Sequence, residues 1–275
     1  MKVSELLNQA SKKLSTVSGK PKLEALILLE KTTKKKREKL IIDLDSEIPE
    51  KLENRYKRLI EKRVEKRIPL SYILGYREFY SLKFITNKHV LIPRIETEGL
   101  VDLALNFLRK KKNPRILDIA TGSGNIIIAI AKNFGKRAKY FASDLSLKAL
   151  KVAQKNAELH NVKINFFSSD LLNSIKETEY FDLIISNPPY VSISEYLEVS
   201  EEVKKEPKIA LLSPEDGLFY IKRIIISMYK YLKKDGKLII EIGENQKVIL
   251  AKQFPFLEFR KDIFNRWRFL CLKKI

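Results

Sequence analysis

The stretch Ile116-Leu117-Asp118-Ile119-Ala120-Thr121-Gly122-Ser123-Gly124-Asn125 decides the fold. Its apolar start predicts a buried strand, and its glycines predict a tight turn into an apolar helix at residues 126–133. Such a turn lets a ligand approach the backbone and presents helix-start amides to it. Ile127 stands where the dinucleotide fingerprint needs a third glycine, which disfavours NAD and FAD. On this loop alone, a tight turn without a ligand is an open alternative.

After Pro93 the chain alternates short β-rich runs with amphipathic helices. This alternation predicts an α/β fold with a doubly wound, Rossmann-like parallel sheet, whose ligands bind at the carboxyl ends of the strands. The expected strands are residues 115–119, 139–143, 164–168, 182–186, 237–242, 257–261 and 267–272. The expected helices between them are residues 126–133, 147–159, 218–232 and 246–253.

The first part of the chain has a helical pattern, because apolar residues recur at three- and four-residue spacing up to about Arg67. Residues 79–85 and 89–92 then predict the two strands of a hairpin, separated by a break at residues 86–88. We therefore expect a helical domain at residues 1–75, a β-hairpin linker at 76–92 and an α/β domain at 93–275. The run Lys34-Lys35-Lys36-Arg37 is typical of a solvated helix end, with a nucleic-acid or ribosome contact as the alternative.

Composition excludes several classes of protein. The 275 residues include 54 Lys+Arg against 34 Asp+Glu, a formal charge of +20, which fits either phosphate-rich partners or a lysine-rich surface. One cysteine and two histidines argue against a disulfide framework and a zinc site, so we expect no metal. Neither a secretory signal nor an apolar run near the ~20 residues of a membrane span is visible. We expect a cytoplasmic protein.

Acidic residues follow two of the expected strands. Asp144 comes directly after the second strand, near the glycine turn, and its carboxylate could accept hydrogen bonds from both hydroxyls of a ribose. Asp170 comes after the third strand and could accept from the exocyclic amine of an adenine. For each of them, a simple helix cap is the alternative.

The fourth strand ends in Asn187-Pro188-Pro189-Tyr190. The prolines lack backbone donors and fix φ, so the Asn187 side chain and the Pro188 carbonyl can form a stiff pair of acceptors. Such a pair matches an NH₂ group on an sp² carbon, which has two N–H donors in one plane. Tyr190 would add an aromatic wall. The alternative is a rigid turn.

These residues resemble a known family. Asn187-Pro188-Pro189-Tyr190 and the glycine loop resemble S-adenosylmethionine-dependent amino methyltransferases. Further stretches are similar to the HemK-type release-factor glutamine methyltransferases: Leu91-Ile92-Pro93-Arg94-Ile95-Glu96-Thr97-Glu98, Glu206-Pro207, Ala210-Leu211, Glu215-Asp216-Gly217-Leu218 and Glu241-Ile242-Gly243-Glu244-Asn245-Gln246. The chain departs from the family at Ile95, where proline is usual, and at Ala120, where glycine is usual.

The resemblance implies a seven-stranded sheet whose last strand is antiparallel, with S-adenosyl-L-methionine as cofactor. It implies that the acceptor is the glutamine in the Gly-Gly-Gln loop of class 1 release factors, which act in translation termination. The implied catalytic residues are Asn187, Pro188, Pro189 and Tyr190, and those for substrate binding are Asn187, Pro188 and Tyr190. The implied cofactor-binding residues are Arg94, Glu96, Thr97, Asp118, Ala120, Thr121, Gly122, Ser123, Gly124, Asp144, Leu145, Asp170, Leu171 and Asn187.

Three other functions compete with this interpretation. A ribosomal-protein glutamine methyltransferase would have the same active-site motifs. A DNA or RNA adenine N6-methyltransferase would suit the acceptor pair and the positive charge. A catalytically silent RNA-binding module would retain the fold alone, although the intact Asn187 argues against it. We expect a monomer that enters no membrane and does not bind nucleic acid directly.

Overall fold

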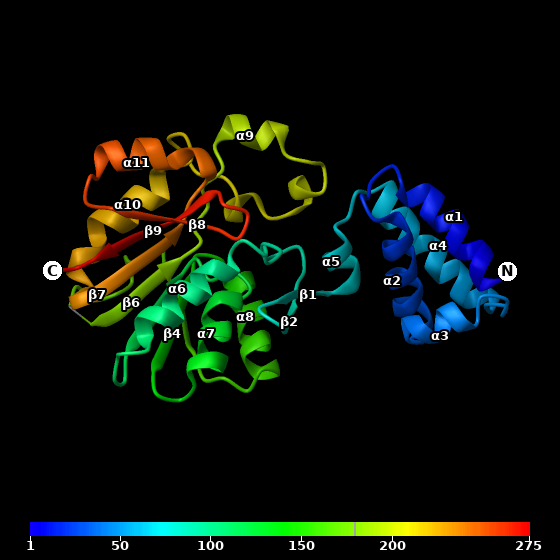
Figure 1. Cartoon of the computed structure of the whole chain (residues 1–275), viewed down its shortest axis with the longest axis horizontal. Coiled ribbons are helices and arrows are strands. Elements are labelled where there is room, and N and C mark those ends of the chain that lie inside the picture. The colour runs from blue at the N-terminus through cyan, green and yellow to red at the C-terminus, as the bar shows by residue number, and fades with distance from the viewer. Residues whose placement is uncertain (179) are drawn as a thin grey trace. The chain divides into compact units, whose positions relative to one another are not determined.

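The computed structural model describes residues 1–178 and 180–275 of the chain. It divides into two compact units (Figure 1). The first comprises Met1–Gly75 together with Ser200–Lys205, and the second comprises Tyr76–Val199 together with Glu206–Ile275. Among the described residues, none of the helices is both long and apolar enough to cross a bilayer.

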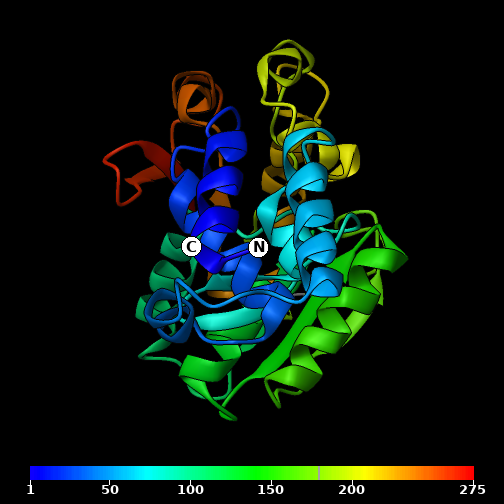
Figure 2. The same ribbon diagram turned by 90° about the vertical axis from the view of Figure 1, so that its right-hand side faces the viewer.

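The first unit is helical. Helices α1, α2 and α4 run side by side (Figure 2), and their apolar faces enclose a core that includes Leu28 and Tyr56. The buried Arg63 side chain makes ion pairs with Glu24 at 2.9 Å and with Glu202 at 2.6 Å, which ties the segment Ser200–Lys205 to the helices. The helices are α1 (Val3–Leu14), α2 (Pro21–Thr33), α3 (Arg37–Ile42), α4 (Glu50–Val64) and α5 (Leu70–Leu74).

The second unit is built on a seven-stranded sheet with the strand order β5-β4-β3-β6-β7-β9-β8. The first five of these strands pair in parallel, and β9 is antiparallel to both of its neighbours. The prediction of a doubly wound sheet with an antiparallel last strand is therefore confirmed. The strands are β3 (Arg115–Ile119), β4 (Lys139–Asp144), β5 (Asn165–Ser168), β6 (Phe181–Ser186), β7 (Leu232–Glu241), β8 (Glu258–Lys261) and β9 (Trp267–Lys273).

Helices cover both faces of this sheet, because successive strand residues point to opposite sides. Ile116 packs with α6 and α7 in one buried cluster, and Leu117 packs with α10 in the other (Figure 1). The helices of this unit are α6 (Glu98–Leu108), α7 (Asn125–Phe134), α8 (Leu147–Leu159), α9 (Ile193–Glu198), α10 (Phe219–Ser227) and α11 (Lys247–Gln253), with short 3₁₀ turns η2 (Lys208–Ala210), η3 (Met228–Lys230) and η4 (Glu244–Gln246). The 3₁₀ turn η1 (Val203–Lys205) belongs to the first unit.

The hairpin strands were predicted wrongly. The structure pairs β1 (Tyr76–Phe79) with β2 (Leu82–Ile85), and residues 89–92 form no strand in the described chain. The turn falls at Tyr80 and Ser81, whose φ angles of 50° and 58° give the hand that suits a two-residue hairpin turn. These residue types carry none of the usual signal for such a turn, so the alternation of residues 79–85 resembled one continuous strand.

Candidate active site

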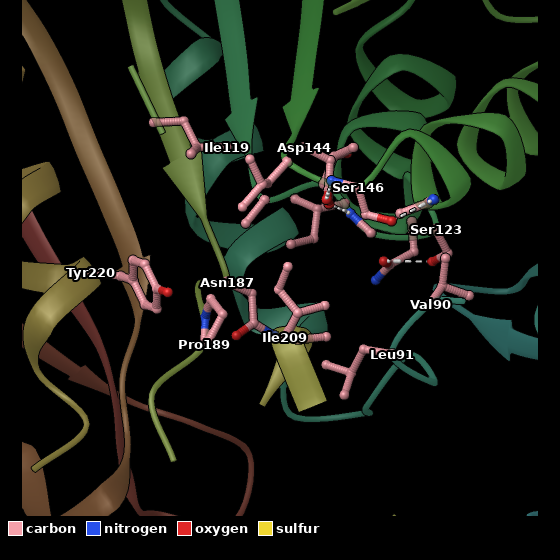
Figure 3. Close-up of a pocket in the computed structure, with 18 of the residues that line it drawn as sticks. Val90, Leu91, Ile119, Ser123, Asp144, Ser146, Asn187, Pro189, Ile209 and Tyr220 are labelled. Atoms are coloured by element: carbon pink, nitrogen blue, oxygen red, sulfur yellow. Dashed lines mark hydrogen bonds between the residues drawn. The ribbon is translucent and has the colours of Figure 1, made fainter. Parts of the chain in front are cut away.

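A cleft lies at the carboxyl ends of β3, β4 and β6. Figure 3 shows Asp144 and Ser146 on one side of it, and Asn187, Pro189 and Ile209 on the other. The residues predicted for the site that line the cleft are Arg94, Thr97, Ala120, Thr121, Gly122, Ser123, Asp144, Leu145, Asp170, Leu171, Asn187 and Pro189. Glu96, Asp118, Gly124, Pro188 and Tyr190 lie outside its lining.

The glycine loop turns sharply between β3 and α7. Gly124 has φ of 78° at the start of α7, and a side chain there would meet Ile128 at 3.0 Å and Ala153 at 3.2 Å. Gly122 has φ of 56° and donates its backbone N–H to Asp144. Only glycine adopts both conformations without strain. The loop therefore brings bare backbone to the cleft, where a ligand can approach it closely.

Ala120 also has a left-handed backbone, with φ of 56°. A side chain in this conformation destabilises the folded state by about 1–2 kcal/mol. Glycine would relieve that strain, but it also makes the unfolded chain more flexible, which offsets part of the gain in stability. We expect Ala120→Gly to raise the free energy of unfolding by about 0.5–1 kcal/mol. Urea unfolding measures this change, with the same substitution at the helical Ala153 as a comparison, because glycine within a helix destabilises it. A lower free energy of unfolding for Ala120→Gly would show that the backbone at Ala120 is not strained.

Asp144 is held by two backbone amides. Its Oδ2 accepts from Gly122 N and its Oδ1 accepts from Ser146 N, both at 2.8 Å. Burial raises the pKa of Asp144, while the amides of Ser146 and Gly122 oppose that rise. Each carboxylate oxygen can accept a second hydrogen bond. The two oxygens thus form a fixed pair of acceptors beside the glycine loop, suited to a vicinal diol.

Asp118 is fully buried beneath the loop and accepts a 2.6 Å hydrogen bond from Thr121 Oγ1. Burial raises its pKa to about 7, against the lowering effect of the Thr121 hydroxyl. Its carboxyl group supports the loop from below and lies outside the cleft lining. The resemblance implies a part for Asp118 in cofactor binding, and its position below the loop would make that part indirect.

The raised pKa of Asp118 makes stability depend on pH. The unfolded chain loses this proton near its ordinary pKa of 3.8, whereas the folded protein keeps it until about pH 7. The contribution to stability is fully present below the lower value and is lost as the pH rises to the upper one. Between pH 5 and pH 8 we expect wild type to lose roughly 2 kcal/mol more unfolding free energy than Asp118→Asn. Urea unfolding at each pH measures both proteins. If their free energies of unfolding changed with pH by the same amount, this expectation would be contradicted.

Asp170 lies at the cleft but is already paired. Its carboxylate contacts the Arg223 guanidinium at 2.9 and 3.3 Å and accepts from Asn173 Nδ2 at 3.1 Å. Arg223 comes from α10, far away in the sequence, and nothing near Asp170 predicts it. An adenine amine at this position would share the carboxylate with Arg223.

Glu206 joins two segments of the cleft wall, a role that the sequence does not show. It is buried, accepts from Ile92 N at 2.9 Å and forms a 2.5 Å ion pair with Arg94. Leu91 and Ile209, which lie near these two residues in the sequence, both line the cleft, as does Tyr220 from α10 (Figure 3). In the sequence, only one observation connected these two segments: the stretches around Arg94 and Glu206 are both similar to the same family.

Asn187 stands at the end of β6. Its Nδ2 donates to Thr97 Oγ1 at 3.2 Å, and Ser186 Oγ donates to the carbonyl of Ile119 at 2.7 Å, which holds the ends of β6 and β3 together. Tyr190 turns away from the cleft, and its hydroxyl donates to Glu241 Oε1 at 3.0 Å. The Asn187 carboxamide therefore faces the cleft opposite Asp144 (Figure 3).

Comparison with known proteins identifies both units. Residues 5–75 match the PrmC N-terminal domain, and residues 99–213 match the methyltransferase small domain. The release factor glutamine methyltransferase of Fusobacterium nucleatum is 37% identical, over 92% of this chain and 73% of its own; that of Rhodopirellula baltica is 36% identical, over 94% and 90%. This chain belongs to the release factor glutamine methyltransferase family.

Other relatives of the family are longer. The bifunctional methyltransferase of Rickettsia typhi is 38% identical over 89% of this chain, which spans about half (51%) of that protein. Among solved structures, the Thermus thermophilus 16S rRNA N2 G1207 methyltransferase has a TM-score of 0.52 at 15% identity, over 73% of this chain and 50% of its own. That likeness shows the methyltransferase fold alone.

The cofactor of this family is S-adenosyl-L-methionine, and the cleft has the groups to hold it. The glycine loop leaves room for close approach, and the fixed acceptor pair of Asp144 would suit the two hydroxyls of a ribose. Ile119, Ile126 and Leu145 add apolar surface for the rest of the molecule. Among residues 1–178 and 180–275, no cluster of His, Cys, Asp and Glu side chains could hold a metal ion.

Proposed function

We propose that this chain transfers a methyl group from S-adenosylmethionine to the side-chain amide nitrogen of the glutamine in the Gly-Gly-Gln loop of class 1 release factors. The observation that carries the proposal is the Asn187 carboxamide at the cleft, opposite the acceptor pair of Asp144. Family membership supports the choice of substrate. The relatives from Fusobacterium and Rhodopirellula are named release factor glutamine methyltransferases.

The main task of the site is to orient an amide. An amide nitrogen is a poor nucleophile, because resonance with the carbonyl group delocalises its lone pair. The barrier to rotation about the amide bond, about 18–20 kcal/mol, indicates the strength of that resonance. Hydrogen bonds to Asn187 Oδ1 and the Pro188 carbonyl, at about 1 kcal/mol each, cannot abolish that resonance. Alignment with the methyl group can supply about 7–11 kcal/mol. Orientation therefore outweighs electronic activation.

The bound cofactor supplies a methyl group on a positively charged sulfur. As the nitrogen gains positive charge, Asn187 Oδ1 and the Pro188 carbonyl stabilise it through the same hydrogen bonds that aim it. Pro188 and Pro189 lack the N–H groups that would compete for these acceptors. When the N–C bond forms and the C–S bond breaks, the bonding electrons would stay on sulfur in a neutral thioether. The added charge makes the nitrogen acidic, and its extra proton would pass to water.

The helical unit is the proposed docking domain for the release factor. Helices α1, α2 and α4 enclose its apolar core, and lysines and arginines are exposed on its surface. A monomer in the cytoplasm, where translation terminates, would suffice for this reaction. Direct nucleic-acid binding is not part of the proposal.

A basic docking surface makes binding depend on salt. Raising NaCl from about 50 to 300 mM shortens the screening length from roughly 14 to 6 Å, so KM for the whole release factor should rise several-fold. A short Gly-Gly-Gln peptide occupies only the cleft, and its kcat/KM should change less than about twofold. Steady-state kinetics with both substrates measures this difference. If the reactions with the whole release factor and with the short peptide were equally sensitive to salt, a docking role of the helical unit would be contradicted.

Mass spectrometry of the products tests the proposed function. Purified enzyme and S-adenosylmethionine are incubated separately with a release factor, a set of ribosomal proteins and duplex DNA. We expect one added methyl group on the glutamine of the Gly-Gly-Gln peptide of the release factor. Label on a ribosomal protein alone, or on DNA alone, would overturn the choice of substrate.

A further inference from the structure

Asn156 is a fully buried polar residue of α8, with 0% of its surface exposed. A buried carboxamide destabilises the fold unless its polar groups find hydrogen-bond partners. Here the partners come from two other segments of the chain. Asn156 Oδ1 accepts from Ile85 N at 2.7 Å, and Nδ2 donates to Ile85 O at 3.2 Å and to Ser123 O at 2.8 Å. One side chain therefore joins the end of β2 to the glycine loop.

These partners fix the direction of the Asn156 carboxamide. Its oxygen meets an N–H group, and its nitrogen meets two carbonyl oxygens. A carboxamide that was turned over would place donor against donor and acceptor against acceptor at every one of these contacts. Both the N–H and the carbonyl of Ile85 are held, as they would be by a neighbouring strand. The connection is therefore specific for an asparagine side chain.

Ser123 is the point at which Asn156 reaches the glycine loop. Gly124 N donates to Thr121 O at 2.8 Å, which closes a tight turn with Gly122 as its first central residue. The peptide unit between Ser123 and Gly124 is planar. Its carbonyl bonds to Asn156 and its N–H bonds to Thr121, so the plane is held on both sides. Asn156 thus fixes the turn that brings bare backbone to the cleft.

Ile85 is the point at which Asn156 reaches the segment after the hairpin. Ile85 ends β2 and packs in an apolar cluster with Val90 and with Ala149 and Val152 of α8. Val90 and Ala149 line the cleft, whereas Ile85 and Asn156 do not. The carboxamide therefore holds two parts of the cleft wall against one helix without contacting the cleft itself.

We propose that Asn156 is a positioning residue for the methyl donor, which sets the glycine turn and the wall segment around Val90 in the arrangement that binds S-adenosylmethionine. The inference rests on the proposed function for its ligand, because it takes this cleft to hold the methyl donor. A preorganised site binds more tightly without any added contact. If the binding arrangement is populated for only a fraction of the time, affinity falls by that fraction.

Two substitutions test the proposal. Asn156→Asp keeps the shape and the acceptor for Ile85 N but loses both donors, and Asn156→Ala removes the carboxamide without burying a charge. Calorimetry with S-adenosylhomocysteine should give a Kd about 10- to 50-fold weaker than wild type for both folded variants. The KM for S-adenosylmethionine should rise in parallel. With saturating cofactor and a Gly-Gly-Gln peptide, kcat should stay within about threefold of wild type, because the bound cofactor restores the arrangement.

His160→Phe is the matched control. His160 ends α8, its Nε2 contacts Lys83 O of β2 at 2.8 Å, and its ring lies 5.1 Å from that of Phe84. The substitution keeps a ring against Phe84 and removes a hydrogen bond between the same helix and the same strand, but it leaves the glycine loop untouched. We expect its Kd to stay within about twofold of wild type. A loss as large as that of Asn156→Ala would overturn the proposal, because attachment of the hairpin alone would then explain the effect.

The Tm of each variant separates positioning from stability. A residue that only stabilises the fold lowers Tm and leaves the Kd of the folded protein unchanged. A Kd for Asn156→Ala within threefold of wild type, whatever its Tm, would therefore overturn the positioning role, as would a loss confined to kcat. A wild-type enzyme that bound S-adenosylhomocysteine but left release factors unmethylated would instead overturn the proposed function, so the two failures are distinguishable.

Discussion

Replacement of Asn187 by alanine should lower kcat by about 10³-fold or more while cofactor affinity stays within a few-fold of wild type. The substitution removes the oxygen that aims the amide nitrogen and stabilises its charge, and loss of one such preorganised group typically costs about 10²–10³ in rate. Loss of alignment adds to this, since a displacement of about 1 Å can cost 10²-fold. The Pro188 carbonyl alone cannot hold a planar NH₂ group in one direction.

Single-turnover kinetics with cofactor in excess isolates this effect, and calorimetry reports cofactor binding separately. Asn133→Ala is the matched control, because Asn133 is exposed on α7 and its Nδ2 donates to Ala129 O of the same helix. We expect the control to keep the wild-type rate. A single-turnover rate for Asn187→Ala within tenfold of wild type would show that another group orients the substrate.

Replacement of Asp144 by alanine should have the second large effect, a loss of about 100-fold or more in cofactor affinity. Hydrogen bonds to a charged acceptor contribute about 1.5–3 kcal/mol each, and this carboxylate is positioned to accept from two ribose hydroxyls. It also orients the loop, because it holds Gly122 N and Ser146 N. Both losses act on binding, so kcat at saturating cofactor should fall much less.

Asp170→Asn provides a graded comparison for this prediction. Asp170 is 40% exposed and paired with Arg223, so its replacement should weaken cofactor binding by less than about tenfold. Calorimetric titration of both variants measures the difference. If Asp170→Asn weakened binding more than Asp144→Ala, the ribose would have to be placed elsewhere in the cleft.

Most of the sheet could be predicted from the sequence, since buried strands such as β3 and β6 are short apolar runs bounded by polar residues or glycine. Elements without that contrast were missed. Helix α6 (Glu98–Leu108) begins at the end of the family motif at residues 91–98. No capping interaction marks its first turn, because the Thr97 side chain does not cap it. Strand β7 begins at Leu232, where the predicted helix was expected to end and before the predicted strand start at Lys237, because the chain bends through η3 into the sheet.

The site could be predicted only where its residues stand at strand ends. Asp144 and Asn187 come directly after or at such ends, and the parallel sheet brings them to one edge. Residues that reach the cleft through contacts distant in sequence carry no local signal. Arg223 pairs with Asp170 from α10, Glu206 holds Arg94, and Glu241 meets Tyr190 from β7. Such pairs follow from tertiary packing, which periodicity does not report.

A crystal structure with S-adenosylhomocysteine and a Gly-Gly-Gln peptide bound together tests the central claim most directly. We expect the side-chain nitrogen of the peptide glutamine at about 2.7–3.2 Å from both Asn187 Oδ1 and the Pro188 carbonyl oxygen, in line with the sulfur. Asn187 Nδ2 should remain on Thr97. A glutamine nitrogen that met neither acceptor, or that faced Asn187 Nδ2, would contradict the account.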